Sequence, residues 1–73
     1  MYATVITYYQ NRKPHTYSKN VQHYLEGREW ACDYVYKQRG RANALPDDDP
    51  SERPVGFLMI IAGHVIQEDL IPD

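Results

Sequence analysis

The 73-residue sequence has a single cysteine, Cys32, so no disulfide can form within one chain. Such cysteine usage suits a reducing compartment. Nothing next to Cys32 would stabilise a thiolate, and we interpret it as a small packing residue. The N-terminus carries no basic, apolar export signal, and the longest apolar run, residues 56–63, is far shorter than the about 20 residues that span a bilayer. These absences predict a cytoplasmic protein without a membrane segment.

Motifs for catalysis and cofactor binding are also missing. His15, His23 and His64 are scattered, and the spacing from His23 to Cys32 fits no zinc site. The aspartates at 47–49 lack the alternating ligands and glycine of a calcium loop. There is no glycine-rich phosphate loop or nucleophile elbow. The sequence therefore predicts a protein that is not an enzyme and that uses no metal, cofactor or small-molecule substrate.

Charge is unevenly distributed along the chain. The formal net charge is −2, but residues 11–41 carry +4 and residues 42–73 carry −6. Such asymmetry indicates a partner that is selected by electrostatics. A chain of this length makes one domain with a small core, so binding across the outer surface is expected rather than binding in a deep cavity.

Four segments have strand character. Residues 2–9 are rich in β-branched and aromatic side chains, a turn is predicted at 11–14, and residues 15–25 alternate as a second, half-exposed strand. Residues 55–61 are continuously apolar and are expected to form a central strand. Gly63-His64 has the form of a type II′ hairpin turn, which would pair Ala62 with Val65 and Ile61 with Ile66 in an acidic edge strand.

One segment, Gly27–Gly40, has a helical period. Gly27 is a possible N-cap, Glu29 lies in the first turn, Lys37 and Arg39 lie in the last turn, and Gly40 suits the C′ position. The expected apolar stripe packs on the sheet and places Trp30 in the core; its members are Trp30, Ala31, Tyr34 and Val35.

These elements predict an α+β fold with a mostly antiparallel sheet and one helix packed on one face. The preferred order is ββαββ. The alternative is βαββ, with a longer helix that starts at Ser18 and contains Gly27 at a cost of about 1 kcal/mol. Residues 1–73 are expected to form a single domain, with 41–54 as a polar acidic loop because this segment has three prolines and three consecutive aspartates.

A basic and aromatic stretch is the best candidate for a binding site. Its predicted partner-binding residues are Arg12, Lys13, His15, Tyr17 and Lys19, and the secondary candidates are Arg39 and Arg41. Tyrosine and arginine are favoured in protein interfaces, and the same mixture suits phosphates and stacked bases.

The opening MYATVITYYQNRKPHTY and the acidic PDDDPSERP segment resemble the small RNA polymerase-binding transcription regulators of Xanthomonas phages, over the whole chain. The resemblance implies a non-enzymatic phage protein in the host bacterial cytoplasm. It would bind host bacterial RNA polymerase, inhibit initiation by disturbing sigma engagement, and promote antitermination. The charge distribution suits a position near nascent RNA, with basic residues toward nucleic acid.

Two alternatives use the same residues. One is another phage inhibitor, such as an anti-CRISPR protein that covers a nucleic-acid-binding surface of a host complex. The other is an RNA-binding module that needs no protein partner. Affinity capture from a bacterial lysate with the tagged protein would distinguish the three hypotheses. Captured polymerase subunits would support the regulator, captured Cas proteins the anti-CRISPR protein, and captured RNA the RNA-binding module.

Overall fold

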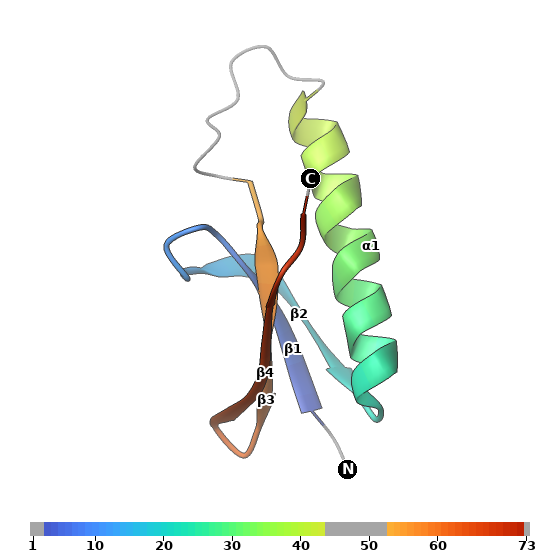
Figure 1. The fold of residues 1–73 in the computed structure, drawn as a ribbon, viewed down its shortest axis with the longest axis vertical. Coiled ribbons are helices and arrows are strands. Elements are labelled where there is room, and N and C mark those ends of the chain that lie inside the picture. Colours follow the sequence, from blue (N-terminus) through green and yellow to red (C-terminus); the bar gives the residue numbers. More distant parts are fainter. Residues whose placement is uncertain (1–2, 44–52, 73) are drawn as a thin grey trace.

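The computed structural model describes residues 3–43 and 53–72. Its elements in chain order are β1 (Ala3–Tyr8), β2 (Pro14–Val21), α1 (Tyr24–Asn43), β3 (Gly56–Ile61) and β4 (His64–Leu70) (Figure 1). The predicted α+β class and the ββαββ order are confirmed. The βαββ alternative is wrong, since Ser18 lies within β2.

The strands of the described segments form one antiparallel sheet in the order β2-β1-β3-β4. β1 and β3 are central, and β2 and β4 are the edges. Helix α1 runs along one face of this sheet (Figure 1). One face of the sheet is therefore covered by α1, and we call the other the open face.

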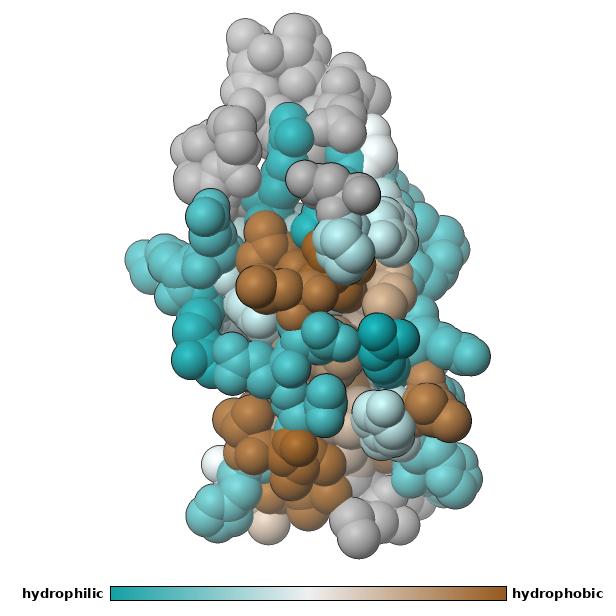
Figure 2. Space-filling view, in the orientation of Figure 1, coloured by the Kyte–Doolittle hydropathy of each residue, from teal (hydrophilic) through white to brown (hydrophobic). Residues whose placement is uncertain are grey.

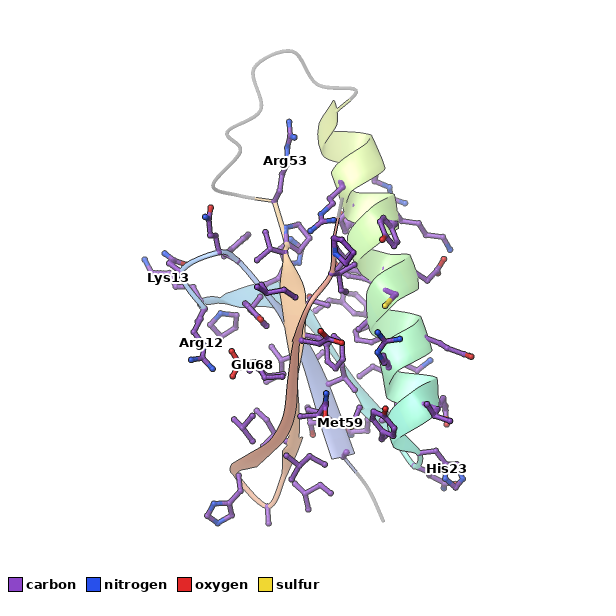
Figure 3. All side chains as sticks on the ribbon, in the orientation of Figure 1. Arg12, Lys13, His23, Arg53, Met59 and Glu68 are labelled. Carbon is purple, nitrogen blue, oxygen red and sulfur yellow. The ribbon has the colours of Figure 1, made fainter. Side chains whose placement is uncertain are left out.

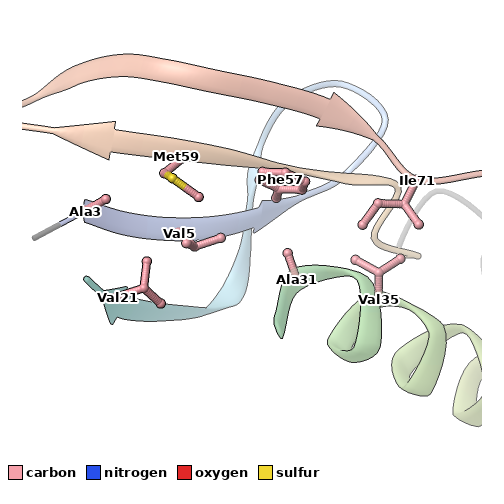
Figure 4. Packing of buried hydrophobic residues seen from close by; sticks show 8 residues of the cluster. All are labelled: Ala3, Val5, Val21, Ala31, Val35, Phe57, Met59 and Ile71. Atoms are coloured by element: carbon pink, nitrogen blue, oxygen red, sulfur yellow. The ribbon is translucent and has the colours of Figure 1, made fainter. Parts of the chain in front are cut away.

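The core lies between the sheet and α1 (Figure 4). Alternation along β1 and β3 directs Val5, Phe57 and Met59 toward the helix, where each is fully buried. Val5 pairs with Met59 across the two central strands. The remaining buried apolar members of this cluster are Ala3, Val21, Ala31, Val35 and Ile71.

The buried stripe of α1 differs from the predicted one. Its members recur every four residues, at Gly27, Ala31, Val35 and Arg39. The predicted Trp30 is only partly buried and packs on the β2 side of the core. The expectation that Trp30 lies in the core was therefore wrong, because the small residues at 27 and 31 provide the face that approaches the sheet.

Gly27 is an interior helix residue and not the predicted N-cap. The helix begins at Tyr24, and the Gly27 amide donates to the His23 carbonyl at 3.0 Å. A Cβ at position 27 would lie 2.7 Å from methyl carbons of both Met59 and Val5. Close approach of α1 to the sheet thus requires glycine here, and this contact outweighs the low helix propensity of glycine.

The helix also ends later than predicted. Gly40 lies inside α1, which continues to Asn43 and places Arg41 in its last turn. The predicted loop at 41–54 is thus wrong for 41–43; its residues 44–52 lie outside the described part of the chain. No helix in the described segments has the length and apolar character needed to cross a membrane.

The turn between β1 and β2 fixes the direction of Arg12. The Arg12 amide donates to the Tyr9 carbonyl, and the Tyr9 amide donates to the Lys13 carbonyl, both at 2.9 Å. Arg12 itself adopts a left-handed conformation with φ 66°. This is the pattern of a three-residue hairpin loop, which is normally completed by glycine at the left-handed position.

The turn between β3 and β4 is one residue earlier than predicted. Ile61 pairs with His64, so the loop is Ala62-Gly63, and both residues have positive φ, 50° and 82°. Positive φ at both positions defines a type I′ turn, with glycine in its second place. The predicted type II′ turn and its pairings, Ala62 with Val65 and Ile61 with Ile66, were therefore wrong. A bulge after this turn changes the register between Met59 and Ile60.

Candidate binding surface

Strand β2 carries most of the predicted site along one exposed edge of the sheet. It pairs with β1 on one side and has no strand on the other within the described residues. Its sequence, PHTYSKNV, contains no acidic residue. Lys13 and Lys19 are exposed, and Tyr17 is 55% exposed. Four of the five predicted residues, Lys13, His15, Tyr17 and Lys19, therefore lie together at this edge.

Three alternating residues of β2, His15, Tyr17 and Lys19, point toward the rim of α1. There they meet Tyr34 and Trp30 of the helix. The ring centroids of Tyr17 and Tyr34 are 5.2 Å apart, those of His15 and Tyr34 are 5.7 Å apart, and Trp30 stacks on Tyr34 at 5.5 Å. The Lys19 ammonium lies 6.0 Å from the Trp30 ring centroid, within the range of a cation–π contact.

Tyr9 extends this group beyond the start of β2, with its ring centroid 5.1 Å from that of His15. We refer to the five connected side chains as the aromatic cluster; its members are Tyr9, His15, Tyr17, Trp30 and Tyr34. At the Tyr9 end lies a shallow pocket of about 370 Å³ in the β1–β2 turn, lined by Tyr9, Gln10, Asn11 and Lys13. The basic and aromatic composition is visible in the sequence, but the predicted helical stripe packs Trp30 and Tyr34 on the sheet and does not include them in this surface.

Burial within the aromatic cluster lowers the pKa of His15. The unfolded chain therefore binds this proton more tightly than the folded protein does. The stability contributed by neutral His15 is complete above the unfolded value of about 6.5 and declines as pH falls through that value toward the folded pKa. Between pH 7 and 5.5 we expect His15→Gln to lose less thermal stability than the wild type. His64→Gln, at an exposed histidine, is the control; the same pH dependence in all three proteins would contradict this prediction.

Arg12, the fifth predicted residue, is directed away from the others. Its guanidinium forms an ion pair with the Glu68 carboxylate of β4 (Figure 3). This contact crosses the open face of the sheet and lies near the Tyr8 hydroxyl, whose pKa is raised by burial and by the Glu68 charge. A partner that uses Arg12 must compete with Glu68, so Arg12 is a weaker binding candidate than the lysines.

The secondary candidates Arg39 and Arg41 have different surroundings. Arg39 is 9% exposed, and its guanidinium donates to the carbonyls of Pro54, Ile71 and Pro72 at 2.7 to 3.0 Å. These bonds join α1 to the chain on both sides of the β3–β4 hairpin. Arg41 is exposed on the last helical turn. The two arginines therefore do not form one site.

The open face carries apolar residues that the sequence did not single out as a surface. Val65, Ile66 and Leu70 of β4 are about half exposed or more. Figure 2 shows apolar surface over the β3–β4 hairpin and again near the end of β4, with a hydrophilic band between the two areas. The hydrophilic residues of this face include the Arg12–Glu68 pair.

Residues 3–43 and 53–72 contain no group of three or more histidine, cysteine or acidic side chains that could hold a metal ion. Cys32 is partly buried against the core. No family model matches the sequence, and neither the curated proteins nor the solved structures include a match. Two observations therefore bear on function: the surface of β2 and the resemblance of the sequence to small phage regulators.

Proposed function

We propose that this protein is a phage-encoded, non-enzymatic regulator that binds host bacterial RNA polymerase in the bacterial cytoplasm. It inhibits initiation by disturbing sigma engagement and promotes antitermination. This proposal rests on the resemblance to the small regulators of Xanthomonas phages.

The observation that supports a protein-binding role is the edge strand β2. Among the described strands it pairs with β1 alone, it has two exposed lysines at or beside it, and it contains no acidic residue. An extended segment or an acidic patch of a partner can bind such an edge through backbone hydrogen bonds and charge complementarity. Tyr17 adds a large exposed side chain of the kind that is enriched in interfaces.

A double charge reversal tests the proposal. Lys13→Glu/Lys19→Glu should weaken binding to purified polymerase holoenzyme by about tenfold, mainly through a slower association rate, because both lysines are exposed charges. Binding kinetics at two salt concentrations and promoter-dependent transcription are the measurements. Arg12 is left unchanged because a carboxylate at this position would lie beside the Glu68 carboxylate.

Arg41→Glu tests the secondary candidate in the same assays, since this arginine is exposed and lies on the last turn of α1. It should bind polymerase like the wild type, and weaker binding would place Arg41 in the interface. Circular dichroism confirms the fold of each variant. Absence of polymerase binding by the wild type would refute the proposed function, whereas equal binding by the wild type and the Lys13/Lys19 variant would refute only the assignment to β2. Capture of a Cas complex in place of polymerase would favour the anti-CRISPR alternative.

A further inference from the structure

The aromatic cluster combines stacked rings with positive charge at both ends. Lys19 lies over Trp30 at one end, and Lys13 lines the shallow pocket next to Tyr9 at the other. Neighbouring ring centroids along this path are 5.1 to 5.7 Å apart for Tyr9–His15, His15–Tyr34 and Tyr34–Trp30. Sites that bind single-stranded nucleic acid without sequence preference combine these two ingredients, since bases stack on aromatic rings and cations follow the phosphates.

The members of this cluster are accessible to different degrees. Tyr17 is 55% exposed and lies against both Trp30 and Tyr34, which are themselves only partly buried. More than half of Tyr17 is therefore accessible to a ligand. The ring of Tyr17 is thus the best placed to receive a base.

The charges on β2 favour a polyanion, since this strand has no acidic side chain. On α1, Asp33 forms an ion pair with Lys37 at 3.0 Å, and the exposed Glu26 and Glu29 lie near the Trp30 end of the cluster. Glu68 and Asp69 lie on β4, at the opposite edge of the sheet. A strand of nucleic acid along the β2 side would therefore avoid the acidic edge of the molecule.

We propose that the aromatic cluster, with Lys13 and Lys19, is a binding site for single-stranded RNA. Bases stack on Tyr17 and the adjacent rings, and the two ammonium groups contact phosphates. The shallow pocket at Tyr9 accepts a terminal base or sugar. This activity goes beyond polymerase binding, because it requires only this chain and RNA.

Trp30 is the only tryptophan in the sequence and reports directly on this site. Titration with oligouridylate of about ten nucleotides, within the range of small single-strand-binding domains, should quench its fluorescence. Anisotropy of a labelled oligonucleotide measures the same binding independently. Two phosphate contacts predict a slope of about −1.4 for the logarithm of the binding constant against the logarithm of salt concentration.

Tyr17→Leu separates stacking from charge, because it removes the ring and keeps both lysines. It should lower RNA affinity about tenfold. Tyr24→Leu is the matched control, since Tyr24 is 50% exposed at the start of α1 and outside the cluster, and it should bind like the wild type. An abasic oligonucleotide of equal length supplies the phosphates without the bases and should bind more weakly than oligouridylate.

Four results would overturn the assignment: no binding of oligouridylate by either measurement, equal binding of the abasic strand, unchanged affinity of folded Tyr17→Leu, or equal affinity for polyglutamate. The last result would identify a site for acidic protein. The same variants are also tested against polymerase free of nucleic acid, so that loss of RNA binding and loss of polymerase binding are measured separately.

Discussion

Gly27→Val is expected to destabilise the protein by about 3 kcal/mol, near the upper end for overpacking a core. A Cβ alone would come within 3.0 Å of side-chain carbons of Met59, Val5 and Val21, and valine adds two further methyl groups. Domains of this size have only about 3–5 kcal/mol of net stability. The variant should therefore retain at most about 2 kcal/mol of stability, as measured by urea denaturation followed by circular dichroism.

Gly40→Val is the matched control for this prediction. Gly40 lies in the same helix, but a Cβ there would meet no atom within 4 Å. Because valine and glycine differ little in helix propensity, stability should change by less than about 0.5 kcal/mol. Equal effects at the two positions would show that helix propensity, and not the distance between α1 and the sheet, decides the outcome.

Arg39→Met is expected to cost about 3 kcal/mol. The variant keeps an unbranched apolar chain but leaves the Pro54, Ile71 and Pro72 carbonyls without the guanidinium that now binds them. Hydrogen bonds to charged groups and unsatisfied buried acceptors each contribute about 1–3 kcal/mol, with partial recovery through water. The Ile71 amide, which donates to the Val55 carbonyl at 2.8 Å, should also exchange faster with deuterium.

Arg41→Met controls for the loss of one positive charge from the same helix. Since Arg41 is exposed, its replacement should change the free energy of unfolding by less than about 0.5 kcal/mol. If urea denaturation and hydrogen exchange give the same result for both variants, Arg39 does not hold the C-terminal segment in place.

Most of the strand segments were predictable because their patterns are local, but the strand predicted at 15–25 ends at Val21, and Tyr24 and Leu25 belong to α1. Alternation placed Val5 and Thr7 on one face of β1, and both are buried. The apolar run at 55–61 contains the central strand β3. The helix boundaries were not predictable in this way. Gly27 precedes the helical period and so has the sequence context of an N-cap. The reason that glycine occupies an interior position is the close approach of Met59 and Val5, which leaves no room for a Cβ.

The binding surface was predictable in part. Composition identified Lys13, His15, Tyr17 and Lys19, and alternation explains why the last three share one face of β2. The separation of Arg12 from this group depends on its left-handed backbone and on Glu68, which is 56 residues away in the chain. Arg39 could not be distinguished from Arg41 by charge or spacing, because its partners are backbone carbonyls of a distant segment.

The central position of β1 also constrains the order in which the sheet can form during and after translation. β1 pairs with β2 within a local hairpin, but its other edge pairs with β3, where Val5 meets Met59. During translation the β1–β2 hairpin is available early, while the second edge of β1 stays open until β3 has left the ribosome. The sheet is thus completed only after synthesis of nearly all the described residues, and the pairing of β1 with β3, which closes the longest loop, is the step expected to limit the folding rate.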